Sequence, residues 1–375
     1  MGFSFQTVLT AVLATNILII FMTLIFKNTT IMIKLGYRIL ALGTLLILLR
    51  LLIPFEFSFT KNINLPEALS YFIAQILHPR INHYSIWHML LVIWCIGIVY
   101  GIWCYIQDYK RLMYFIDINS TDVTTVSPYK KIIMEFSNTQ KDCHRISIYE
   151  TTAISSPMIC GIFRPTILLP KSLSLSPTEL RLVLEHEISH YLHHDLILKF
   201  VVQMICIIYW WNPMCRLFQK QVNTILEIRI DHELTYANPE QKKNYFSCLL
   251  NVAKYSVNET IFSPHVVYYC TNSHSLLQRR FEIGLTKTPK KNYIYNSFFI
   301  TLLVMIYLCS HLFVFEPFYT SPEVEATTVG TMSPDFYYIL DDSGIYNIYY
   351  QGEFIETADS LKYYPGIRSY DEIME

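Results

Sequence analysis

The sequence L-E-H-E-I-S-H at residues 184–190 has two histidines four positions apart and a glutamate directly after the first. On a helix, His186 and His190 lie on one face, one turn apart, where two imidazoles can bind a single zinc ion. Glu187 is then within reach of a water molecule on that metal. The spacing predicts one Zn²⁺ per chain, with Glu187 as the catalytic base. The alternative is a helix with surface histidines and no metal.

A third metal ligand has to come from another part of the chain. A histidine six residues after His190 would indicate the metzincin arrangement, but Leu196 occupies that position. Glu227, in the helical stretch I-L-E-I-R-I-D, is the candidate ligand. Asp231 follows one turn later on the same face, and zinc-binding histidines usually donate their second N–H to such a carboxylate. Asp231 and also Asp195 are therefore candidates for this supporting role.

The helix that carries the two histidines has a clear start signal. Ser176, Pro177 and Glu179 form the pattern of a capping box, with serine at the cap and proline at the first helical position. Residues 179–195 then show helical apolar spacing without a helix breaker. The pattern predicts a helix that begins at Ser176 and presents the H-E-x-x-H motif on one face.

The composition indicates a membrane protein, because 52% of the residues are hydrophobic and only 16% are charged. The net charge of -1 and the absence of a base-reading motif predict no direct nucleic-acid binding. A transmembrane helix needs about 20 mostly apolar residues. The stretches that meet this requirement are 7–26, 35–54, 87–106 and 295–315. A further apolar stretch at 196–211 contains Lys199 and Gln203, and is interpreted as a core or interfacial helix.

Basic residues beside the helix ends predict the orientation, because lysine and arginine concentrate on the cytoplasmic side. These residues are Lys27, Lys34, Lys110, Arg111, Lys287, Lys290 and Lys291. The N-terminus and an acidic C-terminal tail are then outside. The predicted domains are three transmembrane helices in 1–106, a cytoplasmic peptidase domain in 107–293, a fourth transmembrane helix in 294–316 and an extracellular tail in 317–375. The fold class is a mainly α membrane protein with an α+β, gluzincin-like zinc-peptidase domain.

Several segments in order resemble the membrane-bound zinc peptidases of the BlaR/MecR antirepressor type. The similar segments are S-S-P-M-I-C-G-I-F-R-P-T-I-L-L-P, H-E-I-S-H-Y-L-H-H-D-L, W-W-N-P-M-C-R-L-F, E-I-R-I-D and L-L-Q-R-R-F-E-I-G. The resemblance covers roughly residues 1–316. It implies His186, His190 and Glu227 as zinc ligands, Glu187 as base and a cytoplasmic transcriptional repressor as substrate. The tail lacks the family's large penicillin-binding domain, so recognition of beta-lactams is not expected.

Other interpretations stay open at this point. A prenyl-protease or heat-shock-type membrane peptidase also combines H-E-x-x-H with a downstream glutamate, and a noncatalytic receptor or scaffold would not need Glu187. Arg279 and Arg280 mark either a self-cleavage site, as the resemblance implies, or a contact with anionic lipid head groups. The lipid bilayer is an expected partner of the transmembrane helices, and the sequence leaves open whether the chain forms a homodimer.

Overall fold

The computed structural model forms two compact units, which are described separately. One unit contains Met1–Asn62 and Trp87–Phe315, and the other contains Ile63–Ile86 and Glu316–Glu375. The structure describes residues 5–55, 57, 59–66, 80–81, 84–139, 143, 145–152, 154–236, 239–255, 274–286, 293–316, 336–341, 345–350, 353–358 and 367–370.

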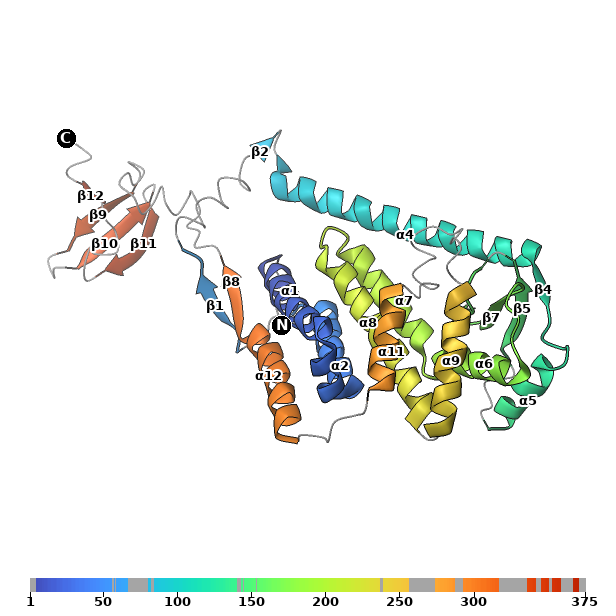
Figure 1. Ribbon diagram of the computed structural model, residues 1–375. Coiled ribbons are helices and arrows are strands. Elements are labelled where there is room, and N and C mark those ends of the chain that lie inside the picture. Colours follow the sequence, from blue (N-terminus) through green and yellow to red (C-terminus); the bar gives the residue numbers. More distant parts are fainter. Residues whose placement is uncertain are drawn as a thin grey trace. The chain divides into compact units, whose positions relative to one another are not determined.

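Among the described residues of the first unit, four helices are long and apolar enough to cross a membrane, as the sequence predicted. They are α1 (Phe5–Lys27), α2 (Thr29–Leu52), α4 (Ile86–Asn119) and α12 (Tyr293–Leu312). Helices α1, α2 and α12 pack on one another (Figure 1). The chain is thus a multi-pass membrane protein with a mainly helical fold.

Helix α4 differs from the predicted segment at 87–106 because it continues to Asn119. Its 34 residues correspond to roughly 50 Å at 1.5 Å per residue. This length exceeds the hydrocarbon core of about 30 Å, so its C-terminal part extends beyond a bilayer. Large apolar side chains on the helix, including Leu91 and Val99, are more than half exposed, as expected for a surface in contact with lipid.

Helix α2 begins earlier than predicted, at Thr29, because the side chain of Asn28 caps it by accepting a hydrogen bond from Ile31 N. The helix is kinked at Gly36, whose φ of 73° suits glycine. Arg50, near its C-terminal end, is 1% exposed. The guanidinium donates to the carbonyl oxygens of Ile53 at 3.2 Å and Ser310 at 2.9 Å. Arg50 therefore pairs within the helix bundle and links α2 to α12.

Helix α8 (Met214–Tyr236) connects the membrane helices to the rest of the unit. It contacts α1, α2 and α7 (Asp195–Ile208), and also α6, α9 and α11. Helix α7 has 14 residues, about 21 Å, and cannot span a bilayer alone. It buries Val202 and Ile205 in the same core as α8, in agreement with a core helix.

A second core lies between a mixed sheet and the helices beside it. The strands are β4 (Ser120–Asp122), β5 (Ser147–Thr151), β6 (Met158–Cys160) and β7 (Thr166–Pro170), in the order β4-β5-β7-β6. β5 and β7 are parallel, with Ile148 opposite Ile167, and the other pairs are antiparallel. The helices are α5 (Tyr129–Thr139), α6 (Pro177–Leu192), α9 (Pro239–Tyr255) and α11 (His274–Leu285). This α+β arrangement agrees with the predicted fold class, and β6 is an edge strand beside α6.

The second unit has a small sheet in the order β11-β10-β9-β12. Its strands are β9 (Phe336–Leu340), β10 (Tyr346–Tyr350), β11 (Glu353–Ala358) and β12 (Arg368–Ser369). The tyrosine-rich stretch at 347–354 thus contains parts of β10 and β11. Short strands also occur at β1 (Lys61–Asn64), β2 (Arg80–Ile81), β3 (Tyr84–Ser85) and β8 (Phe313–Glu316).

The cysteines among the described residues are free thiols.

Candidate metal centre

Helix α6 positions the two histidines of the motif. Its N-terminus has the predicted capping box: Ser176 Oγ accepts from Glu179 N, and the Glu179 side chain accepts from Ser176 N. One face of the helix is buried and carries His186 and His190, which are 9% and 4% exposed. Their rings lie 5.0 Å apart and nearly perpendicular. Both imidazoles are therefore fixed by the helix on the same side, away from bulk water.

Glu227 on α8 completes a cluster that could hold a metal ion. Its Oε2 lies 3.3 Å from His186 Nε2, and its Oε1 lies 3.3 Å from His190 Nε2. Two ligand atoms of a tetrahedral zinc site, each about 2.05 Å from the ion, are about 3.3 Å apart. The side chains are buried, and their ligand atoms all lie within 4.8 Å of one another. The donor set and its spacing thus fit zinc.

Neighbouring charges determine the protonation of His190. Burial alone would lower its pKa, but the charge of Glu227 and the hydrogen bond to Asp195 prevail and raise the pKa to about 9. His190 Nδ1 donates to Asp195 Oδ2 at 2.8 Å, and Arg229 donates to the other oxygen of Asp195 at 2.6 Å. Asp195 is thus hydrogen-bonded to both His190 and Arg229. A metal ion bound by Nε2 would replace the proton there.

Asp231 lies one turn beyond Glu227 on α8 and is reached by two side chains from other helices. Arg280 of α11 donates to both of its oxygens, at 2.8 and 2.6 Å, and also contacts Glu227 Oε2 at 2.8 Å. Tyr245 of α9 donates to Asp231 Oδ1 at 2.6 Å and lies 2.9 Å from His186 Nδ1. Asp231 thus supports His186 through Tyr245, whereas the sequence predicted a direct contact.

Burial and neighbouring charges determine the protonation of Glu227 and Tyr245. Burial opposes the charge of Glu227, yet Arg280 first and His190 second hold its pKa well below the ordinary value. Burial and then the charge of Asp231 raise the pKa of Tyr245 well above its usual range. Tyr245 therefore keeps its proton, while Glu227 remains a carboxylate.

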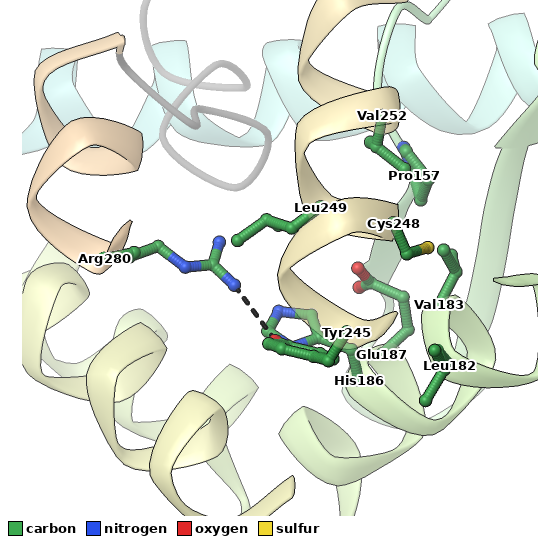
Figure 2. A pocket seen from close by; sticks show the side chains of 10 residues that line it. All are labelled: Pro157, Leu182, Val183, His186, Glu187, Tyr245, Cys248, Leu249, Val252 and Arg280. Carbon is green, nitrogen blue, oxygen red and sulfur yellow. Dashed lines mark hydrogen bonds between the residues drawn. The ribbon is translucent and has the colours of Figure 1, made fainter. Parts of the chain in front are cut away.

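A pocket opens beside the cluster, between α6 and α9. Figure 2 shows the carboxylate of Glu187 in this pocket, close to the cluster residue His186. The remaining lining is mainly apolar and includes Pro157, which directly precedes β6, and Leu249. Cys248 also lines the pocket, but burial first and then the charge of Glu179 raise the pKa of its thiol to about 12. It therefore remains a neutral thiol, and its Sγ lies close to the Glu179 carbonyl.

The structure brings together most of the residues singled out from the sequence. His186, His190, Glu227, Asp195 and Asp231 belong to one buried network. Arg280 belongs to it too, and its side chain is 1% exposed. The interpretation of Arg280 as a lipid contact is therefore wrong, because its guanidinium is paired with buried carboxylates. Tyr245 was missed, since no local pattern sets this tyrosine apart from the many others.

A membrane-spanning chain with a buried His-His-Glu cluster and a second glutamate in the adjoining pocket has the construction of a membrane metallopeptidase. The family model of the BlaR1 peptidase M56 matches residues 44–283, and the chain belongs to this family. The match includes the motif helix, α8, α9 and Arg280. It favours the BlaR/MecR resemblance over the heat-shock-type alternative.

Two curated relatives align with parts of the chain. Regulatory protein BlaR1 of Bacillus licheniformis is 33% identical over 88 residues, which are 23% of this chain and 15% of the relative. The methicillin resistance mecR1 protein of Staphylococcus aureus is 26% identical over 131 residues, which are 34% of this chain and 22% of the relative. The alignments thus cover less than a quarter of either relative.

Proposed function

We propose that the chain is a zinc endopeptidase that uses His186, His190 and Glu227 as ligands and Glu187 as general base. The observation that carries the proposal is the buried three-residue cluster, with 3.3 Å between Glu227 and each histidine, beside the pocket that contains Glu187. A catalytic zinc site keeps three protein ligands and an open position. A noncatalytic scaffold would have no use for Glu187 in the pocket.

Several residues of the chain have separate roles in peptide hydrolysis. Zinc held by these residues would act as a Lewis acid and would lower the pKa of a bound water molecule to about 7. Glu187 accepts the proton of the attacking water and transfers it to the departing amine of the peptide. His190 keeps its orientation through Asp195, at 2.8 Å. The apolar side chains of Val183 and Leu249 limit water in the pocket.

A peptide substrate would bind in an extended conformation. β6 is the edge strand of its sheet, and Pro157 connects this edge to the pocket lining. An edge strand has unpaired backbone groups that can pair with an added strand, but the residues of β6 are buried, so a peptide would reach this edge only after the residues that cover it move aside. Such binding would position a peptide bond of a protein substrate next to Glu187.

We infer that the substrate is a cytoplasmic transcriptional repressor. The family and the relative named as a regulatory protein support a role in signal transduction. The three ligands and the base lie in one chain, so this chemistry would not require a homodimer.

The function is tested by comparing membranes that carry the wild-type chain or its Glu187→Gln variant. New N-termini of cytoplasmic proteins are identified by mass spectrometry after incubation with each preparation. Cleavage of a regulator only by the wild type is expected. The Glu185→Gln variant, altered two positions away on the same helix, serves as the matched control and should cleave like the wild type. Cleavage that persists in Glu187→Gln would argue against the proposal.

A prediction follows for the orientation in the membrane. The basic residues at helix ends support a cytoplasmic peptidase domain, proposed as 107–293, and an external N-terminus and tail. External protease added to intact cells is expected to digest the tail at 317–375 and to spare the 110–290 region. The reverse pattern, with the tail protected, would invert the topology.

Self-cleavage near Arg279 and Arg280 is a further prediction. Both residues lie on α11, which is tethered to the active site at high effective concentration. Cleavage requires α11 to unwind, because Arg280 is buried and paired with Asp231 and Glu227. Expressed wild-type protein is expected to release a C-terminal fragment that begins at Arg280, and Glu187→Gln should not. If both chains stay intact while the wild type cleaves another protein, activation does not use this bond.

A further inference from the structure

Arg280 carries a positive charge in the protein interior, with 1% of the residue exposed. Removing a guanidinium from water costs several kcal/mol unless it is paired. Arg280 meets this requirement with two carboxylates, through two bonds to Asp231 and one 2.8 Å contact to Glu227 Oε2. The two-point contact with Asp231 uses the planar fork of arginine, which lysine does not have. One side chain thus holds the proposed ligand and its neighbour on α8 together.

The hydrogen bonds of Tyr245 determine which nitrogen of His186 carries a proton. Tyr245 Oη has a single hydrogen, and it donates this hydrogen at 2.6 Å to the Asp231 carboxylate, which also accepts from Arg280 at both oxygens. Oη must then be the acceptor at 2.9 Å from His186 Nδ1. Nδ1 therefore donates to Oη, and the second ring nitrogen, Nε2, is left for a metal ion. This is the nitrogen that lies 3.3 Å from Glu227 Oε2.

We propose that Tyr245 and Arg280 are positioning residues of the zinc centre: Tyr245 directs the Nε2 lone pair of His186 toward the metal, and Arg280 fixes Glu227 and Asp231. The inference rests on the proposed function. Neither residue is a ligand or lies in the H-E-x-x-H motif. Both come from helices that follow α8 in the chain, so α9 and α11 complete a centre whose ligands are on α6 and α8. Figure 2 shows the hydrogen bond from Arg280 to the Tyr245 hydroxyl, with His186 beside Tyr245.

The test measures metal binding by the purified full chain in detergent, separately from proteolysis. The variants are Tyr245→Phe, which removes one oxygen, and Arg280→Lys, which keeps the charge and loses the fork. Loss of such supporting contacts typically weakens metal binding 10–100-fold. We expect a rise of about that size in the zinc dissociation constant of each variant, measured by chelator competition. The Co²⁺-substituted variants should also have altered visible spectra.

Two control variants distinguish the loss of a specific contact at the zinc centre from a general loss of stability. Tyr255→Phe changes an exposed tyrosine at the end of the same helix, and Arg279→Lys changes the partly exposed neighbour of Arg280. Both should keep the wild-type dissociation constant and Co²⁺ spectrum.

Wild-type zinc affinity and Co²⁺ spectra in Tyr245→Phe and Arg280→Lys would overturn the inference, even if both variants were less stable. If Arg280→Lys does not fold, Tyr245→Phe decides, because it deletes only the hydroxyl. A wild-type chain that binds no zinc would overturn the proposed function together with this inference. Zinc bound equally by wild type and variants would overturn this inference alone.

Discussion

Replacing Glu187 with glutamine is expected to lower the rate of peptide hydrolysis by about 10²–10⁴-fold. Glutamine has nearly the same shape as glutamate, but it cannot accept a proton from water and transfer it to the leaving amine. The zinc content should not change, because the cluster that fits the metal consists of His186, His190 and Glu227. The measurement is the initial rate of cleavage of an identified substrate at equal zinc loading.

The Glu185→Gln variant is the control for this experiment. Glu185 lies on α6 as well, but the pocket lining includes Glu187 and not Glu185. Its rate should equal that of the wild type. A Glu187→Gln variant that cleaves at the wild-type rate would exclude the carboxylate as the general base, even if zinc is bound.

Changing Asp231 to alanine is expected to lower the free energy of unfolding of the metal-free chain by about 3 kcal/mol. The substitution removes the main partner of Arg280, whose guanidinium is 1% exposed and bonded twice to Asp231. It also leaves the Tyr245 hydroxyl without its 2.6 Å acceptor. The loss lies at the lower end of the range for broken buried ion pairs, because Glu227 still contacts Arg280. Denaturant unfolding in detergent micelles measures the difference.

The Asp117→Ala variant provides the comparison, since Asp117 is an exposed carboxylate on α4. Its free energy of unfolding should be close to that of the wild type. Equal stability of Asp231→Ala and Asp117→Ala would mean that Arg280 finds other partners or reaches water when Asp231 is lost.

Local sequence patterns were sufficient for the elements that carry the motif. The capping box at Ser176 and Glu179 predicted the start of α6, and helical spacing then placed His186 and His190 on one face. Apolar length predicted the four membrane helices. The lengths of α2 and α4 were underestimated because a hydropathy window ends where polar residues begin, whereas hydrogen bonding in the helix continues to Asn119.

Contacts between distant helices were harder to predict. Asp231 was expected to accept an imidazole N–H, but the structure inserts the Tyr245 hydroxyl between it and His186. Arg280 was interpreted from its dibasic neighbourhood, while its carboxylate partners lie on α8, about 50 positions earlier. Helical periodicity reports which side of a helix is apolar. It contains no information on which side chain of another helix fills a gap in the core.

We propose that His186, His190 and Glu227 hold one zinc ion in each chain. Metal analysis of the purified full chain tests it most directly, with the His186→Ala/Glu227→Ala double variant purified in parallel. About one zinc per wild-type chain is expected, and little or none in the double variant, because a lone histidine cannot retain the ion. Stoichiometric zinc in the double variant would contradict the assignment of this centre.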